Sequence, residues 1–142
     1  MRILGLDVGS RTVGIALSDE MGWTAQGMET LRFPENQLDQ VIPQLAEYIR
    51  RYEIQTIVVG LPKNMDGTIG ARGQFCLEFG QKLQAELSVD IVFWDERLTT
   101  VAAHKYLIEA DMSRKKRKKV VYKIASVLIL QSYLDSKSSA SL

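Results

Sequence analysis

An acidic residue stands inside an apolar run near the N-terminus of this chain. The segment Arg2-Ile3-Leu4-Gly5-Leu6-Asp7-Val8-Gly9 is otherwise apolar enough to form a buried strand. Burying a carboxylate there is costly unless a cationic group compensates its charge. The next residues, Gly9-Ser10-Arg11-Thr12, have the composition of a tight turn, and a second strand-like run follows at 13–18. An acid on a central strand beside a glycine-bearing hairpin indicates a site for a metal ion or a phosphate group.

The size and composition of the chain favour one ordinary globular domain. It has 142 residues, of which 46% are hydrophobic and 25% charged, so a real core can form. We expect a single domain at 1–137 and a flexible tail at 138–142. Cys76 is the single cysteine, which excludes an intramolecular disulfide and a cysteine zinc cluster. With no signal peptide and no run of ~20 apolar residues, the expected location is the cytoplasm.

The spacing of apolar and turn-forming residues predicts the element order β-β-β-α-β-α-β-α-α. The expected strands are 2–8, 12–18, about 23–33, 55–60 and 89–94. The expected helices are 38–52, one around 75–87, one from an N-cap at Thr99 or Thr100 to about 110, and one from Ser113 to about 134. Trp23 and Trp94 are expected to pack in the core or against strands. The first three strands would form an antiparallel meander, and the other two would join by right-handed crossovers. The predicted fold is α/β, with a five-stranded mixed sheet and helices on both faces.

Three acids could meet in this fold. Asp7 lies on the first strand, while Asp95 and Glu96 follow the fifth strand at the end where open α/β sheets bind ligands. Side chains alternate along a strand, so only one of the latter two reaches the site unless the strand has already ended. Converging carboxylates suit Mg²⁺ or Mn²⁺, and two such ions can activate water for phosphodiester hydrolysis. The alternative is that Asp7 caps a turn or pairs with Arg11 or Arg97.

A run of six basic residues is the second strong feature of the sequence. It precedes an apolar helix and consists of Arg114, Lys115, Lys116, Arg117, Lys118 and Lys119. Cations at a helix N-terminus oppose the macrodipole, so local stability does not account for this placement. The run favours an anionic partner such as a phosphate backbone, bound in a strongly salt-dependent way. The alternative is a solvated start of a helix.

The segment from Gly60 to Gly67 follows the fourth predicted strand and contains several turn residues. Lys63, Asn64 and the nearby Arg72 could contact phosphates, although the segment is equally compatible with a simple crossover loop. His104, the single histidine, is expected to be a solvated helical side chain and not a general base.

Five blocks of the sequence, in order and spread over nearly the whole chain, resemble the YqgF/RuvX family. These blocks are Ile3-Leu4-Gly5-Leu6-Asp7-Val8-Gly9, Gly14-Ile15-Ala16-Leu17-Ser18-Asp19, Val59-Gly60-Leu61-Pro62-Lys63-Asn64-Met65-Asp66-Gly67, Trp94-Asp95-Glu96-Arg97-Leu98-Thr99-Thr100, and the basic run with Ile129-Leu130-Gln131-Ser132-Tyr133-Leu134-Asp135. Members of this family are described as Holliday junction resolvases or as nucleases of pre-16S ribosomal RNA.

The resemblance implies a ribonuclease H-like fold and a metal-dependent nuclease. Asp7 and Glu96 would hold Mg²⁺ or Mn²⁺, and Asp95 would be a further candidate catalytic acid. The expected contacts to nucleic acid are Arg11, Lys63, Asn64, Arg72, Arg97 and the basic run.

One position departs from the family pattern. The third family carboxylate is an aspartate on the last helix, where this chain has Val121-Tyr122-Lys123. A phenol with a pKa near ~10 stays protonated at neutral pH and is a poor ligand for Mg²⁺. Metal binding would then be weaker, or Asp111 or Asp135 would substitute, or the chain would bind nucleic acid without cutting it.

The resulting hypothesis is a metal-dependent endonuclease that processes the 5′ end of pre-16S rRNA in ribosome biogenesis. One alternative is a Holliday junction resolvase of DNA recombination and repair, and another is a binding module with weak or no catalysis. A sugar kinase or actin-like ATPase needs two such domains, and this chain has room for one. The expected partner is precursor rRNA or branched DNA, with no membrane, and the protein would be a monomer or a weak homodimer.

Overall fold

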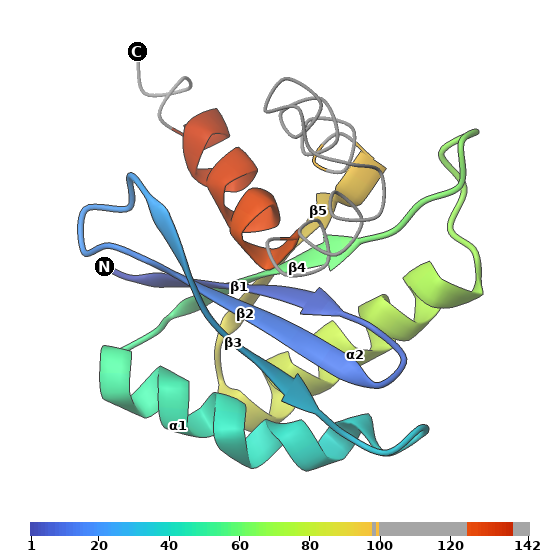
Figure 1. Cartoon of the computed structure of the whole chain (residues 1–142), viewed down its shortest axis with the longest axis horizontal. Helices are drawn as coiled ribbons and strands as arrows, with labels where there is room; N and C mark the ends of the chain where they lie inside the picture. Colours follow the sequence, from blue (N-terminus) through green and yellow to red (C-terminus); the bar gives the residue numbers. More distant parts are fainter. Residues whose placement is uncertain (98, 100–124, 138–142) are drawn as a thin grey trace, which may run out of the picture.

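The computed structural model describes residues 1–97, 99 and 125–137, and within them five strands form one mixed sheet (Figure 1). The strands are β1 (Ile3–Val8), β2 (Thr12–Ser18), β3 (Ala25–Arg32), β4 (Thr56–Leu61) and β5 (Asp90–Asp95). Their order across the sheet is β3-β2-β1-β4-β5. β2 runs antiparallel to its neighbours β1 and β3, whereas β4 is parallel to β1 and to β5. The predicted meander followed by two parallel strands is therefore confirmed, and β1 with its acid lies at the centre.

Helices cover both faces of the sheet (Figure 1). They are the 3₁₀ turn η1 (Leu38–Val41), α1 (Ile42–Tyr52), α2 (Ala71–Leu87) and a C-terminal helix that the structure describes over 125–137. Pro43 lies in the first turn of α1, where its missing N–H leaves no hydrogen bond unmade. No helix among the described residues combines the length and the apolar character that crossing a bilayer requires.

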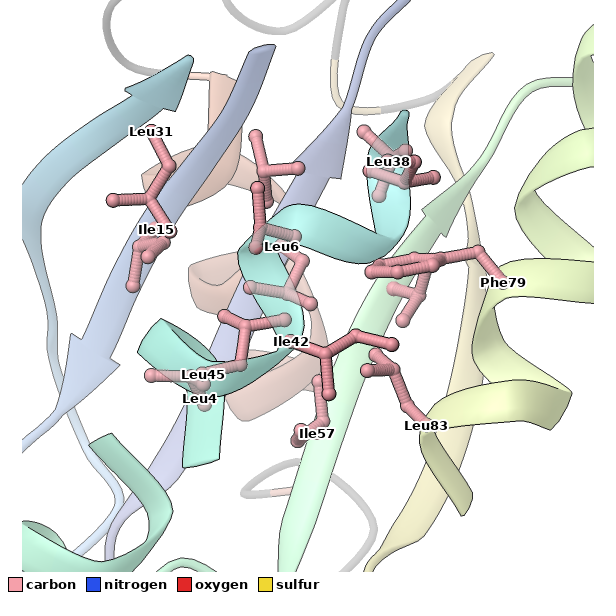
Figure 2. Packing of buried hydrophobic residues seen from close by; sticks show 14 of the residues in the cluster. Leu4, Leu6, Ile15, Leu31, Leu38, Ile42, Leu45, Ile57, Phe79 and Leu83 are labelled. Carbon is pink, nitrogen blue, oxygen red and sulfur yellow. The ribbon is translucent and has the colours of Figure 1, made fainter. Parts of the chain in front are cut away.

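The larger core lies between the sheet and the layer of α1 and α2 (Figure 2). Alternate residues of the strands point into it, and the helices contribute leucine, isoleucine and phenylalanine side chains. Its members include Leu4, Leu6, Ile15, Leu31, Ile42, Leu45, Ile57, Phe79 and Leu83. The centre of this face is filled by apolar side chains.

A smaller core lies on the opposite face, under the C-terminal helix. It is formed by Ile3, Ala16, Val58, Ile129, Leu130 and Leu134. Ile3 and Asp7 are an even number of residues apart on β1, so their side chains point to this same face. The smaller core covers the beginning of β1, and the acid lies toward its end.

Two expectations are corrected. The helix predicted to begin at Thr99 or Thr100 begins earlier, because Glu96, Arg97 and Thr99 already have helical conformation. Trp23 is not a core residue, since it is 65% exposed in the turn between β2 and β3. His104, the basic run from Arg114 to Lys119, Asp111, Tyr122 and the predicted tail at 138–142 lie outside the described residues.

Candidate active site

Glycines on neighbouring strands surround Asp7. Gly14 of β2 pairs directly with Asp7, and a Cβ atom on Gly14 would lie 3.7 Å from the Cβ of Asp7 and 3.5 Å from the Oγ of Ser126. Gly5 lies two residues before Asp7 on β1 and faces the same side of the sheet. An added Cβ at Gly5 would lie 2.7 Å from the Cβ of Leu130. The missing side chains let the C-terminal helix approach the sheet closely and keep space free beside the acid.

Glu96 folds back over the sheet into space that Gly60 leaves open. A Cβ atom on Gly60 would lie 2.5 Å from the Oε1 of Glu96 and 2.5 Å from the Cδ1 of Ile129. Gly60 is in β4, directly beside the central β1, whereas Glu96 follows the outer strand β5. The glycine therefore lets the Glu96 side chain reach across β4 toward Asp7.

The carboxyl groups of Asp7 and Glu96 meet and share a hydrogen bond. Burial and the negative charge of Asp7 raise the pKa of Glu96 to about 8. Burial also raises the pKa of Asp7, although the hydrogen bond from Glu96 and the charge of Arg72 act in the opposite direction. Two carboxyl groups this close repel each other when both are ionised, so the raised pKa of Glu96 favours one proton shared by the pair. Loss of that proton would leave two adjacent anions that need a cation.

Arg72 supplies positive charge beside the pair. It is the second residue of α2, and its Nη2 donates a hydrogen bond of 3.1 Å to the backbone carbonyl of Val8, at the end of β1. Its charge lowers the pKa of both Asp7 and Glu96. The guanidinium is thus anchored at one point, and its remaining donors are placed at the same edge of the sheet as the two acids.

Asp95 has a different role from Glu96. Phe93 packs in the larger core and Trp94 in the smaller one, so alternation places Asp95 on the face opposite Asp7. Its Oδ1 accepts a hydrogen bond of 3.0 Å from the backbone N–H of Arg97, the geometry of a helix N-cap. The Arg97 side chain also donates from Nε and, at 2.7 Å, from Nη2 to Asp95 Oδ2. This pairing holds the pKa of Asp95 below its usual range.

Of the other residues predicted to contact nucleic acid, Arg11 and Asn64 already interact with side chains of this protein. Arg11 forms an exposed ion pair of 3.1 Å with Glu35. The Asn64 amide donates to Thr68 Oγ1 at 2.9 Å, so it holds its own loop together. The positive charge of Lys63 lowers the pKa of Asp95, which places this lysine at the same edge of the sheet.

Asp135, the substitute acid considered above, lies away from Asp7. It is exposed and accepts a hydrogen bond of 2.9 Å from Gln131 Nε2, which also donates to the backbone carbonyl of Trp23. Trp23 precedes β3 at the end of the sheet where β1 begins, while Asp7 lies near the end of β1. The two acids therefore lie at opposite ends of the strands.

The chemistry of the donor set fits a divalent cation that prefers oxygen. Asp7 and Glu96 present carboxylate oxygens at one place, the ligand type of Mg²⁺ and Mn²⁺. Within the part of the chain that the structure describes, no group of three or more His, Cys, Asp or Glu side chains could hold a metal ion. A cation bound there would take two protein carboxylates from these residues and complete its shell with water or substrate oxygens.

Sequence reasoning did not identify three residues that shape the site. Gly14 and Gly60 make room for the acids, and the buried Ser126 lies against Gly14. A glycine inside an otherwise β-branched run, as in Val58-Val59-Gly60, is a signal of close approach by another group. The sequence does not show which group approaches.

Known proteins resemble this chain over nearly its whole length. The family model described as "RuvX: Holliday junction resolvase" matches residues 1–136. Proteins of Bacillus thuringiensis (strain Al Hakam) and Bacillus cereus (strain AH820), both named "Putative pre-16S rRNA nuclease", are 57% identical over 137 residues, which cover 96% of this chain and 100% of theirs.

Two solved structures share the fold at low sequence identity. RuvC of T. thermophilus in complex with a Holliday junction substrate has a TM-score of 0.66 at 12% identity, over 98% of this chain and 96% of that one. The fowlpox virus resolvase in complex with Holliday junction DNA has a TM-score of 0.51 at 10% identity, over 96% and 98% of the two chains. The predicted ribonuclease H-like fold is confirmed by these likenesses. The match of the family model to residues 1–136 and the 57% identity to the Bacillus proteins show that this chain belongs to the RuvX family.

Proposed function

We propose that this protein is a metal-dependent endonuclease of the cytoplasm that processes the 5′ end of precursor 16S rRNA. The observation that carries the proposal is the contact between Asp7 of β1 and Glu96, which follows β5: two half-buried acids with an arginine beside them. Perturbed carboxylates brought together at a sheet edge are typical of catalytic sites. The name that the 57% identical Bacillus proteins carry supports the choice of substrate.

In this proposal Asp7 and Glu96 hold Mg²⁺ or Mn²⁺. The bound ion would supply an activated water and stabilise the negative charge that develops on the leaving oxygen. The release of the shared proton prepares the pair for this task, because two ionised carboxylates offer more oxygen donors than a hydrogen-bonded pair.

Arg72 would bind the non-bridging oxygens of the scissile phosphate. Its hydrogen bond to the Val8 carbonyl fixes the guanidinium plane, so a bidentate contact costs little further ordering. Lys63 would add attraction for the backbone at the same edge. Arg97 would act indirectly, since its side chain is already bound to Asp95.

A cleavage assay tests this function directly. The substrate is a 5′-extended 16S rRNA precursor incubated with Mg²⁺ or Mn²⁺, and the products are mapped to single nucleotides. We expect Asp7→Asn and Glu96→Gln to lose activity at least a hundredfold while binding the RNA normally. If the wild-type protein binds the precursor without cutting it under either ion, the chain is a binding module and not a nuclease.

A Holliday junction resolvase is the second candidate, favoured by the description of the matching family model. Resolution requires two symmetric cuts, so it needs a dimer or paired action on a four-way junction. Symmetric cleavage of a junction by a dimer, with no cleavage of precursor RNA, would select this function over the first.

A further inference from the structure

Met65 presents an apolar side chain entirely to solvent. It is 100% exposed, more than any other large hydrophobic residue that the structure describes. It lies in the loop of residues 62–70 between β4 and α2, which projects away from the sheet (Figure 1). An isolated exposed methionine is ordinary on a protein surface, so a binding role for Met65 has to be argued from the conformation and position of its loop.

The loop is fixed in its extended position by its own hydrogen bonds. The backbone N–H of Asn64 donates to the Thr68 carbonyl at 2.8 Å, and that of Gly67 donates to the Asn64 carbonyl at 2.9 Å, which places Met65 at the corner of a tight turn. Thr68 donates from its backbone N–H and from Oγ1 to Asp66 Oδ1, at 3.0 and 2.6 Å. Gly67 has a φ of 87°, which a residue with a side chain adopts only with strain. The turn thus holds Met65 outward, away from the surface of the protein.

The same loop is joined to the candidate active site. Arg97, which directly follows Glu96, donates from Nη1 to the carbonyl oxygens of Asn64 at 3.3 Å and Met65 at 3.5 Å. Gly60, which contacts the Glu96 carboxylate, is five residues before Met65, and five residues of chain span at most ~18 Å. The exposed thioether therefore extends from the edge of the sheet that carries the acids, Arg72 and Lys63.

We propose that Met65 packs against an unpaired base of the RNA substrate, a few nucleotides from the bond that is cut. Unpaired bases in RNA are splayed out and are bound by stacking on protein side chains. A methionine can do this because its thioether is flexible, polarisable and favourable against aromatic rings. It offers no strong donor or acceptor to a base edge, so the contact would tolerate any base and would serve to place the strand. The identity of the ligand rests on the proposed function.

Methionine oxidation tests this contact without any need for catalysis. The wild-type protein in EDTA is exposed to dilute hydrogen peroxide with and without an RNA hairpin that carries single-stranded flanks, and each methionine is followed by mass spectrometry. We expect the RNA to slow the oxidation of Met65 at least threefold. Met21, which is 69% exposed in the turn after β2, is the matched control and should oxidise at the same rate in both samples.

RNA that binds, by fluorescence anisotropy, without protecting Met65 overturns this inference but leaves the proposed function standing. RNA that does not bind at all overturns both.

Substitution gives a second, kinetic test. We expect Met65→Ala to raise the KM for the precursor RNA about tenfold, the scale of one lost base-stacking contact, with kcat within twofold. Met65→Leu should restore most of the loss, and Met21→Ala should have no effect. A KM for Met65→Ala equal to that of the wild type, in a protein with an unchanged melting temperature, would overturn the proposal.

Discussion

The Oε1 atom of Glu96 occupies the space above β4 that a side chain at Gly60 would need. An added Cβ would lie 2.5 Å from that oxygen, well inside van der Waals contact. We therefore expect Gly60→Ala to displace the Glu96 carboxylate from Asp7 and to lower nuclease activity at least tenfold. The measurement is cleavage rate together with the melting temperature.

Gly27→Ala provides the control for this prediction. Gly27 is on the outer strand β3, and its added Cβ would approach one methyl group of Val127 at 3.3 Å. It should retain activity within twofold. Equal activity of Gly60→Ala and the wild type would show that the observed position of Glu96 is not needed for catalysis.

Glu96 makes the stability of the metal-free protein depend on pH. Its pKa is about 8 in the folded protein, whereas an unperturbed glutamate has a pKa of 4.5, so between these limits the folded state holds a proton that the unfolded state has lost. The stabilising contribution is therefore complete below about pH 4.5 and disappears as the pH rises through about 8. Relative to Glu96→Gln, the wild type should lose about 4 kcal/mol of unfolding free energy between these pH values.

Urea unfolding in EDTA at pH 5 and at pH 8.5 measures this difference. Glu96→Gln keeps the shape of the side chain but has no proton to lose, so it removes the effect of this group alone. A wild-type to variant difference that does not change with pH would contradict the close contact between Asp7 and Glu96.

Arg72 should be essential for activity, unlike Arg11. We expect Arg72→Lys to lower kcat about a hundredfold, because a lysine cannot hold the Val8 carbonyl and also offer a planar pair of donors to phosphate. Arg11→Lys should change activity less than threefold, since Arg11 forms an exposed ion pair with Glu35. Similar losses in both variants would indicate general electrostatic attraction in place of a specific phosphate contact.

The family resemblance implies that Tyr122 stands at the position of a third carboxylate, four residues before Ser126 in the sequence. If this position contributes to the metal site, Tyr122→Asp should tighten Mn²⁺ binding by about tenfold or more and raise turnover, because it adds a charged oxygen ligand. Calorimetric titration and the cleavage assay measure both effects. Equal binding and equal turnover in the two proteins would show that Tyr122 lies away from the metal.

Most of the sheet, including the strand that carries Asp7, could be predicted from the sequence. Periodicity and turn residues were sufficient to predict β1, β2, β4 and β5 within one or two residues, because an apolar run with an interrupting glycine or proline leaves few alternatives. The same alternation indicated that Asp95 and Glu96 face opposite ways. Which of the two meets Asp7 came from the family resemblance, since residue alternation alone does not say which face the C-terminal helix covers.

Other features could not be predicted because composition alone does not show which of several polar side chains will form a local hydrogen bond. The helix after β5 begins at Glu96 because the Asp95 side chain caps it, although two threonines further along are equally good caps by composition. Trp23 is exposed because the short turn at Asp19–Thr24 places it outside the sheet. Its β-strand propensity therefore did not predict its burial. The shape of the loop around Met65 results from hydrogen bonds among Asn64, Asp66 and Thr68, and the presence of these residues in the sequence does not show that they bond to one another.

A crystal of the protein soaked in Mn²⁺ would show directly whether Asp7 and Glu96 bind a metal ion together. We expect anomalous scattering from manganese between the carboxylates of Asp7 and Glu96, with Asp95 still bound to Arg97, and no such signal in Asp7→Asn. Manganese bound elsewhere, or an unchanged Asp7–Glu96 hydrogen bond at saturating Mn²⁺ and pH 8.5, would contradict it.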